Sequence, residues 1–136
     1  MNGKFVPSAE IDHARLDWGQ MGWISSPPTT GAKQIVQILV TLAPGGGHNF
    51  HKHPRQEETI HVLSGEIEQW LEKERRSLRP GDTVFIGADT VHASFNTGSQ
   101  PARLLVVLSP AVGEGGYELV DVATEAPWNA LRQGPA

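Results

Sequence analysis

Cysteine is absent from this chain of 136 residues, so neither disulfide bonds nor thiol chemistry contribute to it. Basic residues are few: 11 Lys and Arg stand against 15 Asp and Glu, and no basic stripe is present, so we expect no nucleic-acid partner. No apolar run approaches the roughly 18 residues of a membrane span, so we expect no membrane segment. The opening sequence MNGKFVPSAEIDH lacks the apolar stretch of a signal peptide. A cytoplasmic location follows as the default expectation.

Glycine and proline, in contrast, are abundant, with 15 and 10 residues. This composition is typical of many short strands joined by tight turns. The chain has the length of one domain with one core, and no repeat or linker divides it. We therefore expect residues 1–136 to form a single all-β domain.

Strand patterns support this fold class. Residues 34–42, QIVQILVTL, give the strongest strand prediction, and Val36, Ile38, Val40 and Leu42 share one apolar face. Turn signals every 8–12 residues or so indicate roughly nine to eleven strands. At the two ends, residues 1–17 are expected to form an extended arm, and residues 127–132 a single helical turn opened by proline.

Four of the six histidines lie within segment 45–65. On a strand, His51 and His53 share one face. Pro54 and Arg55 indicate a turn, which lets Glu58 meet the histidines from the next strand. Two imidazoles and a carboxylate at one point are typical of a divalent transition-metal site. Taken alone, the His-x-His pair is equally compatible with two surface histidines on a polar loop.

The same alternation assigns faces to the neighbouring residues. Glu57, the rival carboxylate, points away if Glu58 points inward. His61 falls on the outer face. His48 falls opposite His51, so it is left outside the predicted site.

Segment 45–65 resembles the first conserved motif of the cupin family at every fixed position: Gly45, five residues, His51, one residue, His53, four residues, Glu58, six residues, Gly65. The second cupin motif is similar to segment 81–96: Gly81, five residues, Gly87, one residue, Asp89, two residues, His92, three residues, Asn96. The chain departs from the family at Gly87, usually proline, and at Asp89, usually glycine. These two positions shape the turn before the ligand and do not bind metal.

The resemblance implies a cupin-type double-stranded β-helix, or jelly-roll barrel, with an N-terminal arm and a short C-terminal tail. It adds His92 as the fourth ligand, so that the expected metal set is His51, His53, Glu58 and His92. This set accepts Fe, Mn, Ni or Zn and leaves coordination positions open for substrate or O₂. Small cupins of this kind are expected to form homodimers, with the arm pairing against a second subunit.

The expected function also follows from the resemblance. Many cupins with this ligand set resemble quercetinase-type dioxygenases, which implies oxidative cleavage of a small enol or diketone. Two alternatives stay open: a non-oxidative enzyme (isomerase, cyclase, lyase or decarboxylase) and a non-catalytic module that binds a small ligand. Inner-face alternation supplies the candidate substrate pocket: Ile60, Val62, Gln69, Val84, Ile86, Ser94 and Asn96.

Overall fold

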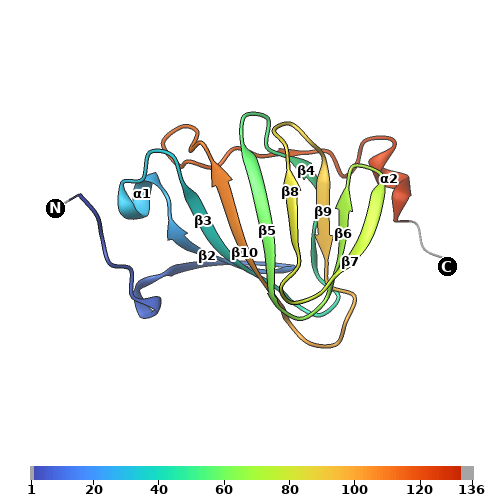
Figure 1. The fold of residues 1–136 in the computed structure, drawn as a ribbon. Coiled ribbons are helices and arrows are strands. Elements are labelled where there is room, and N and C mark those ends of the chain that lie inside the picture. The colour runs from blue at the N-terminus through green and yellow to red at the C-terminus, as the bar shows by residue number, and fades with distance from the viewer. Residues whose placement is uncertain (1, 133–136) are drawn as a thin grey trace.

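The computed structural model describes residues 2–132, which form eleven strands in two facing antiparallel sheets (Figure 1). The six-stranded sheet has the order β1 (Asp12–Leu16), β2 (Gly19–Ser25), β3 (Val36–Leu42), β10 (Ala102–Ser109), β5 (Glu57–Ser64), β8 (Thr83–Ile86). The five-stranded sheet has the order β11 (Val120–Asp121), β4 (Gly47–Lys52), β9 (His92–Phe95), β6 (Ile67–Leu71), β7 (Glu74–Leu78). This arrangement confirms the expected double-stranded β-helix.

Three short helical elements accompany the sheets: η1 (Ser8–Glu10), α1 (Pro27–Thr30) and α2 (Trp128–Leu131). The last one confirms the helical turn expected after Pro127. No helix among residues 2–132 has the length and apolar character needed to cross a membrane.

The main core lies between the sheets, and the long strands of the six-stranded sheet supply most of it. Burial alternates along β3 and β10, as expected for strands with one face packed inward. Their inward side chains include Ile38, Leu42, Leu104 and Leu108, each almost fully buried. The alternation predicted for residues 34–42 is thus the one that builds the barrel interior.

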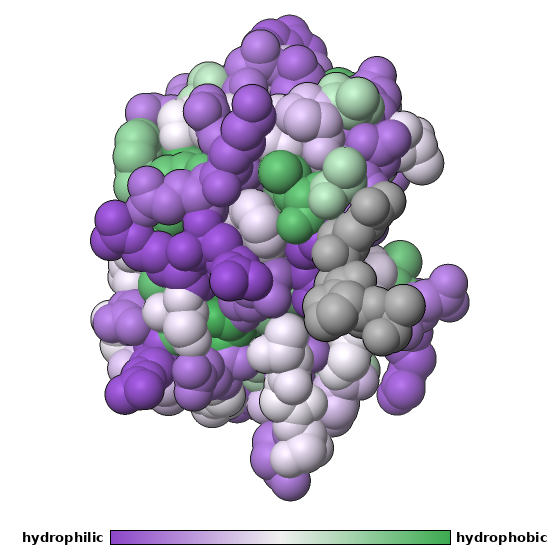
Figure 2. All heavy atoms as spheres, turned by 90° about the vertical axis from the view of Figure 1, so that its right-hand side faces the viewer, coloured by the Kyte–Doolittle hydropathy of each residue, from purple (hydrophilic) through white to green (hydrophobic). Residues whose placement is uncertain are grey.

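A second apolar cluster covers the outer face of the five-stranded sheet. Phe50, Trp70 and Phe95 form it together with Val122 from the C-terminal segment. Trp128 of α2 lies 5.7 Å from Phe50 between ring centroids, so the tail packs against the back of β4. The side of the barrel that carries β7 and α2 is otherwise mainly hydrophilic, with separate small hydrophobic patches (Figure 2).

The N-terminal segment extends the six-stranded sheet. β1 pairs with β2 from Asp12↔Trp23 to Leu16↔Gly19, and all five of its residues are exposed. The residues before β1 run along the outside of the barrel near α1, where Lys4 donates a hydrogen bond to the Thr29 carbonyl (Figure 1). The expected arm therefore ends in an edge strand.

Candidate metal centre

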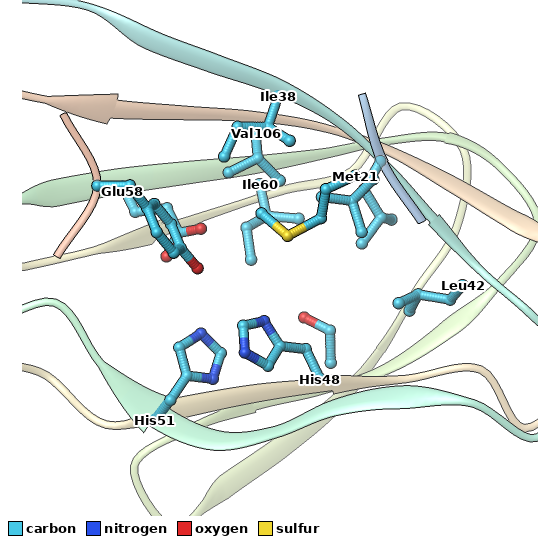
Figure 3. A pocket seen from close by; sticks show the side chains of 12 residues that line it. Met21, Ile38, Leu42, His48, His51, Glu58, Ile60 and Val106 are labelled. Carbon is cyan, nitrogen blue, oxygen red and sulfur yellow. The ribbon is translucent and has the colours of Figure 1, made fainter. Parts of the chain in front are cut away.

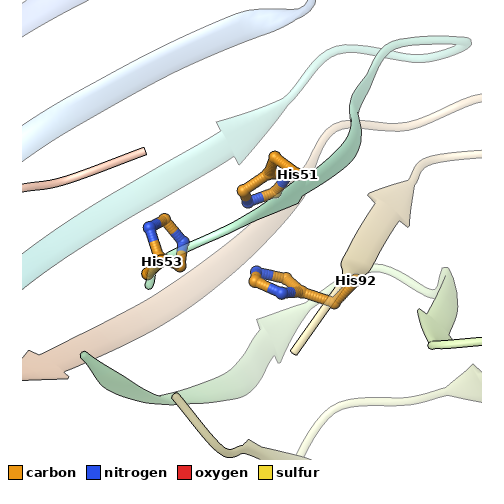
Figure 4. Close-up of side chains that lie close together, drawn as sticks. All are labelled: His51, His53 and His92. Atoms are coloured by element: carbon orange, nitrogen blue, oxygen red, sulfur yellow. The ribbon is translucent and has the colours of Figure 1, made fainter. Parts of the chain in front are cut away.

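Three histidine side chains point toward one another in the interior of the protein (Figure 4). His51 lies on β4 opposite His92, the first residue of β9, and His53 follows the end of β4. One ring nitrogen from each lies within 4.8 Å of the other two, and all three residues are buried. The described residues thus contain a three-histidine group that could hold a metal ion.

Backbone carbonyls set the orientation of each ring. In every case Nδ1 faces a carbonyl oxygen: His51 with Asn49 at 2.6 Å, His53 with Glu118 at 2.7 Å, His92 with Thr90 at 3.0 Å. A carbonyl only accepts hydrogen bonds, so Nδ1 carries the proton and donates it. Nε2 of each neutral ring is therefore left as a free electron-pair donor, as metal-binding histidines require.

Glu58, from β5 of the opposite sheet, approaches this group. Its Oε1 lies 2.8 Å from Nε2 of His92 and 3.3 Å from Nε2 of His53. These three atoms are buried and have no hydrogen-bond partner. Buried electron-pair donors facing one another are unfavourable unless a cation lies between them. The donor set therefore fits a divalent metal held by imidazole nitrogen and carboxylate oxygen.

The pKa shifts of Glu58 and His53 show the same demand for positive charge, whereas that of His51 shows an imidazole kept neutral. Burial raises the pKa of Glu58, but contact with His53 and His92 outweighs it and holds the pKa well below its usual range. Burial lowers the pKa of His51, and the neighbouring His48 and His92 lower it further. Burial also lowers the pKa of His53, yet contact with Glu58 prevails and raises it. Proton and metal would compete for this site.

Two of the four predicted ligands, His51 and Glu58, line a small cavity of about 30 Å³ between the sheets (Figure 3). His48 and His51 form one wall, and Glu58, Ile60 and Met21 lie on the opposite one. The remaining lining is mostly apolar and comes from the six-stranded sheet: Ile38, Val40, Leu42, Leu104 and Val106. One wall of the cavity is thus polar, and the opposite wall is apolar apart from Glu58.

His48 lines this cavity, contrary to the face assigned to it by alternation. It pairs with Ser94 while His51 pairs with His92, so three steps along β4 match two along β9. Such an extra residue is a β-bulge, which brings positions three apart onto the same face. The two rings stack at 3.6 Å between centroids. The sequence signal for this bulge is Asn49 within it, because asparagine favours irregular backbone conformations.

The seven residues predicted for the pocket divide into two groups. Ile60 and Ser94 line the cavity. The others are not among its lining residues: Val62, Gln69, Val84, Ile86 and Asn96. Val62 and Ile86 are buried core residues. Alternation identifies inward side chains but does not tell which end of the barrel they reach.

Hydrogen bonds account for the two polar residues of the second group. Gln69 accepts a hydrogen bond from the Ser94 hydroxyl at 2.6 Å. It therefore contacts a residue that lines the cavity without lining the cavity itself. Asn96 donates to the carbonyls of Leu42 and Gln100 and therefore ties the end of β3 to the loop before β10. The carboxylates follow the predicted faces, because Glu58 is buried and Glu57 is exposed.

Sequence reasoning missed Tyr117 as well as His48. Tyr117 lies on the segment between β10 and β11, where glycines surround it and no strand period applies. Its ring centroid lies 5.1 Å from that of His53, and the residue lines the cavity. Burial is the largest cause of a raised pKa for its hydroxyl, so the phenol is neutral.

Comparison with known proteins adds a family to this geometry. The family model described as "Cupin domain" matches residues 38–108. "Polyketide synthase CurC" from Streptomyces cyaneus is 32% identical over 127 residues, which cover 93% of this chain and 81% of the relative. Quercetin 2,3-dioxygenase from Bacillus subtilis is 33% identical over 64 residues, only 47% of this chain and 19% of that protein.

A solved structure shares the architecture. It is described as a predicted oxalate decarboxylase from Thermotoga maritima, with a TM-score of 0.70 and 24% sequence identity. The match covers 79% of this chain and 99% of that one. At this identity the likeness concerns the fold.

Proposed function

The chain belongs to the cupin family, and from that premise we propose that it is a metal-dependent enzyme acting on a small enolisable molecule. The proposed ligands are His51, His53, Glu58 and His92, and the proposed metal is one divalent Fe, Mn, Ni or Zn per chain. The leading reaction is an O₂-dependent, dioxygenase-type oxidation.

One observation carries this proposal: the buried, unpartnered Nε2 atoms of His53 and His92 converge on Oε1 of Glu58, a residue that lines a mostly apolar cavity. A structural zinc is normally closed by four tetrahedral ligands, whereas a metal with octahedral coordination keeps two positions open to substrate beyond four protein ligands. Here His51 and Glu58 line a cavity together with Met21 and Ile60. When bound, the metal supplies Lewis acidity and, if redox-active, electron exchange with O₂.

The chain's own residues contribute orientation and exclusion of water. The carbonyls of Asn49, Thr90 and Glu118 hold the three imidazoles with Nε2 inward. Apolar side chains of β3 and β10 keep the substrate oxygen and the ligands in a medium of low dielectric constant, which strengthens their electrostatic interaction. These features suit an enolate oxygen carried by an otherwise apolar molecule.

The names of two relatives support this substrate class. One is called a polyketide synthase and the other a quercetin dioxygenase. Polyketides and flavonols both carry enolisable or phenolic oxygens on carbon skeletons with few charges. We therefore propose a polyketide-like or phenolic substrate.

A non-oxidative reaction, such as a cyclisation or isomerisation, is the second candidate. The observation that favours it is His48, a neutral imidazole in the cavity wall that is not among the proposed ligands. A neutral imidazole can take up and return a proton without any change in oxidation state. A module that only binds its ligand is the third reading, distinguished by the absence of turnover.

The test begins with metal counted per chain after purification without chelator or affinity tag. About one metal ion per chain is expected, and failure to bind metal even after anaerobic reloading would sink the proposal. The loaded protein is then incubated with a flavonol or a 1,3-diketone under air and under argon. O₂ uptake with product supports the leading reaction, turnover under argon supports the second candidate, and stoichiometric binding without turnover supports the module.

We also propose that the whole chain works as a single-domain homodimer in the cytoplasm. An exposed edge strand, β1, and a fully projecting aromatic, Phe5 at 86% exposure, favour pairing through the N-terminal arm. Sedimentation velocity of the chain and of a variant lacking residues 1–16, which removes Phe5 and β1, tests this pairing. A monomer at both lengths would contradict it.

A further inference from the structure

We propose that an apolar pocket on the outside of the barrel binds the neutral aromatic part of the substrate, and that Tyr117 divides this pocket from the metal cavity. This inference rests on the proposed function and names the substrate class more closely. The outer pocket has a volume of about 440 Å³, whereas the cavity beside the histidines has about 30 Å³. Small-molecule sites usually need about 300–1,000 Å³, which the inner cavity alone does not offer.

The Tyr117 ring contacts both compartments. On the inner side its centroid lies 5.1 Å from that of His53. On the outer side it meets Trp23 edge-to-face, at 5.5 Å and an interplanar angle of 81°. Tyr117 also lines both the cavity and the outer pocket. A single aromatic side chain therefore stands between the pocket and the proposed ligands.

The segment that carries Tyr117 is held by a buried glutamine. Gln56 is 1% exposed, and its amide nitrogen donates to the carbonyls of Pro110 and Gly116 at 2.9 and 2.8 Å. Its Oε1 accepts the backbone N–H of Glu118 at 2.9 Å. Both flanks of Tyr117 are thereby fixed, so access past it depends on the ring itself.

The same segment closes the pocket against α1. Gly116 has φ = +81°, and a Cβ there would come within 2.5 Å of Pro27 Cδ. Glycine is therefore required for this close approach. The pocket is consequently formed between two elements distant in sequence, residues 115–117 and the start of α1.

The chemistry of the walls identifies the occupant. Trp23, Tyr117 and Pro28 present ring surfaces, which suit a planar, uncharged aromatic group. Asp12 also lines the pocket, and its carboxylate disfavours an anionic group. A substrate with an enol or phenol oxygen at the metal and a neutral ring beyond Tyr117 fits both compartments.

The experiment compares two probes that present the same diol to the metal, catechol and 4-phenylcatechol. Protein loaded with redox-inert Zn(II) is titrated with each probe by calorimetry, after its metal content is measured. The expected result is about tenfold tighter binding of 4-phenylcatechol. That preference corresponds to about 1.4 kcal/mol, in the range for a ring that is partly buried.

Variants locate the preference. Trp23→Ala is expected to reduce the preference for 4-phenylcatechol to about twofold or less, because it removes a ring from the pocket wall. Pro28→Asp is expected to have the same effect, because it adds a negative charge to the pocket wall. Residue 28 is exposed and lies in the first turn of α1, where an acidic side chain is tolerated. Phe85→Ala removes an exposed aromatic far from the pocket and is the control, with the preference unchanged. Tyr117→Ala is expected to speed association of 4-phenylcatechol about tenfold in stopped-flow measurements.

Four results would overturn the inference while leaving the metal site intact. They are equal binding of the two probes, no binding of either to zinc-loaded protein, an unchanged preference in a folded Trp23→Ala or Pro28→Asp protein, and an unchanged association rate in Tyr117→Ala. A shift of Pro28→Asp from dimer to monomer would instead assign the pocket to a second copy of the chain. Absence of bound metal in the parent protein after loading with Zn, Fe, Mn and Ni in turn refutes the proposed function and, with it, this inference.

Discussion

The two walls of the cavity come from two sheets that differ in regularity as well as in chemistry. The six-stranded sheet contributes long strands with even alternation, and its wall is apolar apart from Glu58. The five-stranded sheet contributes a bulged β4 and a four-residue β9, and its wall carries His48, His51 and Ser94.

This contrast has a physical reason. In a regular ladder the backbone carbonyls are engaged with neighbouring strands, so few remain for side chains. The three carbonyls that accept from the histidines belong to Asn49 in the bulge and to Thr90 and Glu118, which lie outside strands. Irregular backbone therefore orients the ligands, while regular strands supply the apolar burial that stabilises the barrel.

The largest expected effect concerns the histidines of the five-stranded sheet. His92→Ala should weaken metal binding about a thousandfold, because zinc sites with four ligands bind with roughly 10–16 kcal/mol in total. The fold should persist, since the apolar core does not depend on the metal. Competition with a chelator measures the affinity, and circular dichroism measures the fold.

The matched control for this prediction is His61→Ala. His61 lies on the outer side of β5 and contacts the Thr83 hydroxyl, so metal binding should not change. An unfolded His92→Ala protein would show that the metal is structural, and the distinction between the two sheets would fail.

A substitution on the apolar wall should instead reduce stability and leave metal binding unchanged. Ile38→Ala removes a side chain that is fully buried between the sheets, and should lower the free energy of unfolding by about 3 kcal/mol. Metal bound per folded chain should stay the same. Phe85→Ala, on the exposed side of the same sheet at 57% exposure, should change stability by less than about 0.5 kcal/mol. Urea denaturation compares the two, and similar losses would contradict the assignment of the core.

Glu58 is the one charged residue on the otherwise apolar wall. Its substitution should reduce metal affinity by less than the loss of a histidine does. Glu58→Gln keeps an oxygen donor but removes the negative charge, so metal affinity should fall about tenfold. Glu57→Gln, one residue away and exposed, should leave the affinity unchanged. Chelator competition at pH 7 measures both, and the reverse order would mean that the two carboxylates exchange roles.

The smallest expected effect is a pH dependence from His48. Burial, the largest cause, lowers its pKa from 6.5 to about 4. The unfolded chain then binds this proton at higher pH than the folded one, so stability falls as pH drops from 6.5 towards 4. Between pH 7 and 5.5 the metal-free protein should lose about 1 kcal/mol through His48.

His48→Phe should remove this contribution. Its free energy of unfolding should therefore decline less steeply over the same pH range, as measured by urea titrations of metal-free protein. Identical slopes in the two proteins would show that His48 is solvated and not part of the cavity wall.

Local periodicity was sufficient for much of the site. A strand has a period of two, so the spacing of His51, His53 and Glu58 indicates which side chains share the interior without knowledge of distant contacts. The same rule placed Glu57 and His61 on the outside, where the structure has them. The two motif spacings, through their resemblance to cupins, indicated the fold.

Other features of the site do not follow from the two-residue period of a strand and depended on the tertiary structure. The β-bulge in β4 shifts the alternation of inward and outward side chains by one residue. His48 therefore lines the cavity, although strict alternation from His51 places it on the opposite face. His53 owes its orientation to the carbonyl of Glu118. The hydrogen bond from Gln56 to the carbonyl of Gly116 joins residues 60 positions apart in the sequence. Tyr117 and the outer pocket also arise only when the segment after β10 meets α1 and β2. Such contacts depend on how distant segments pack, and no short stretch of sequence carries that information.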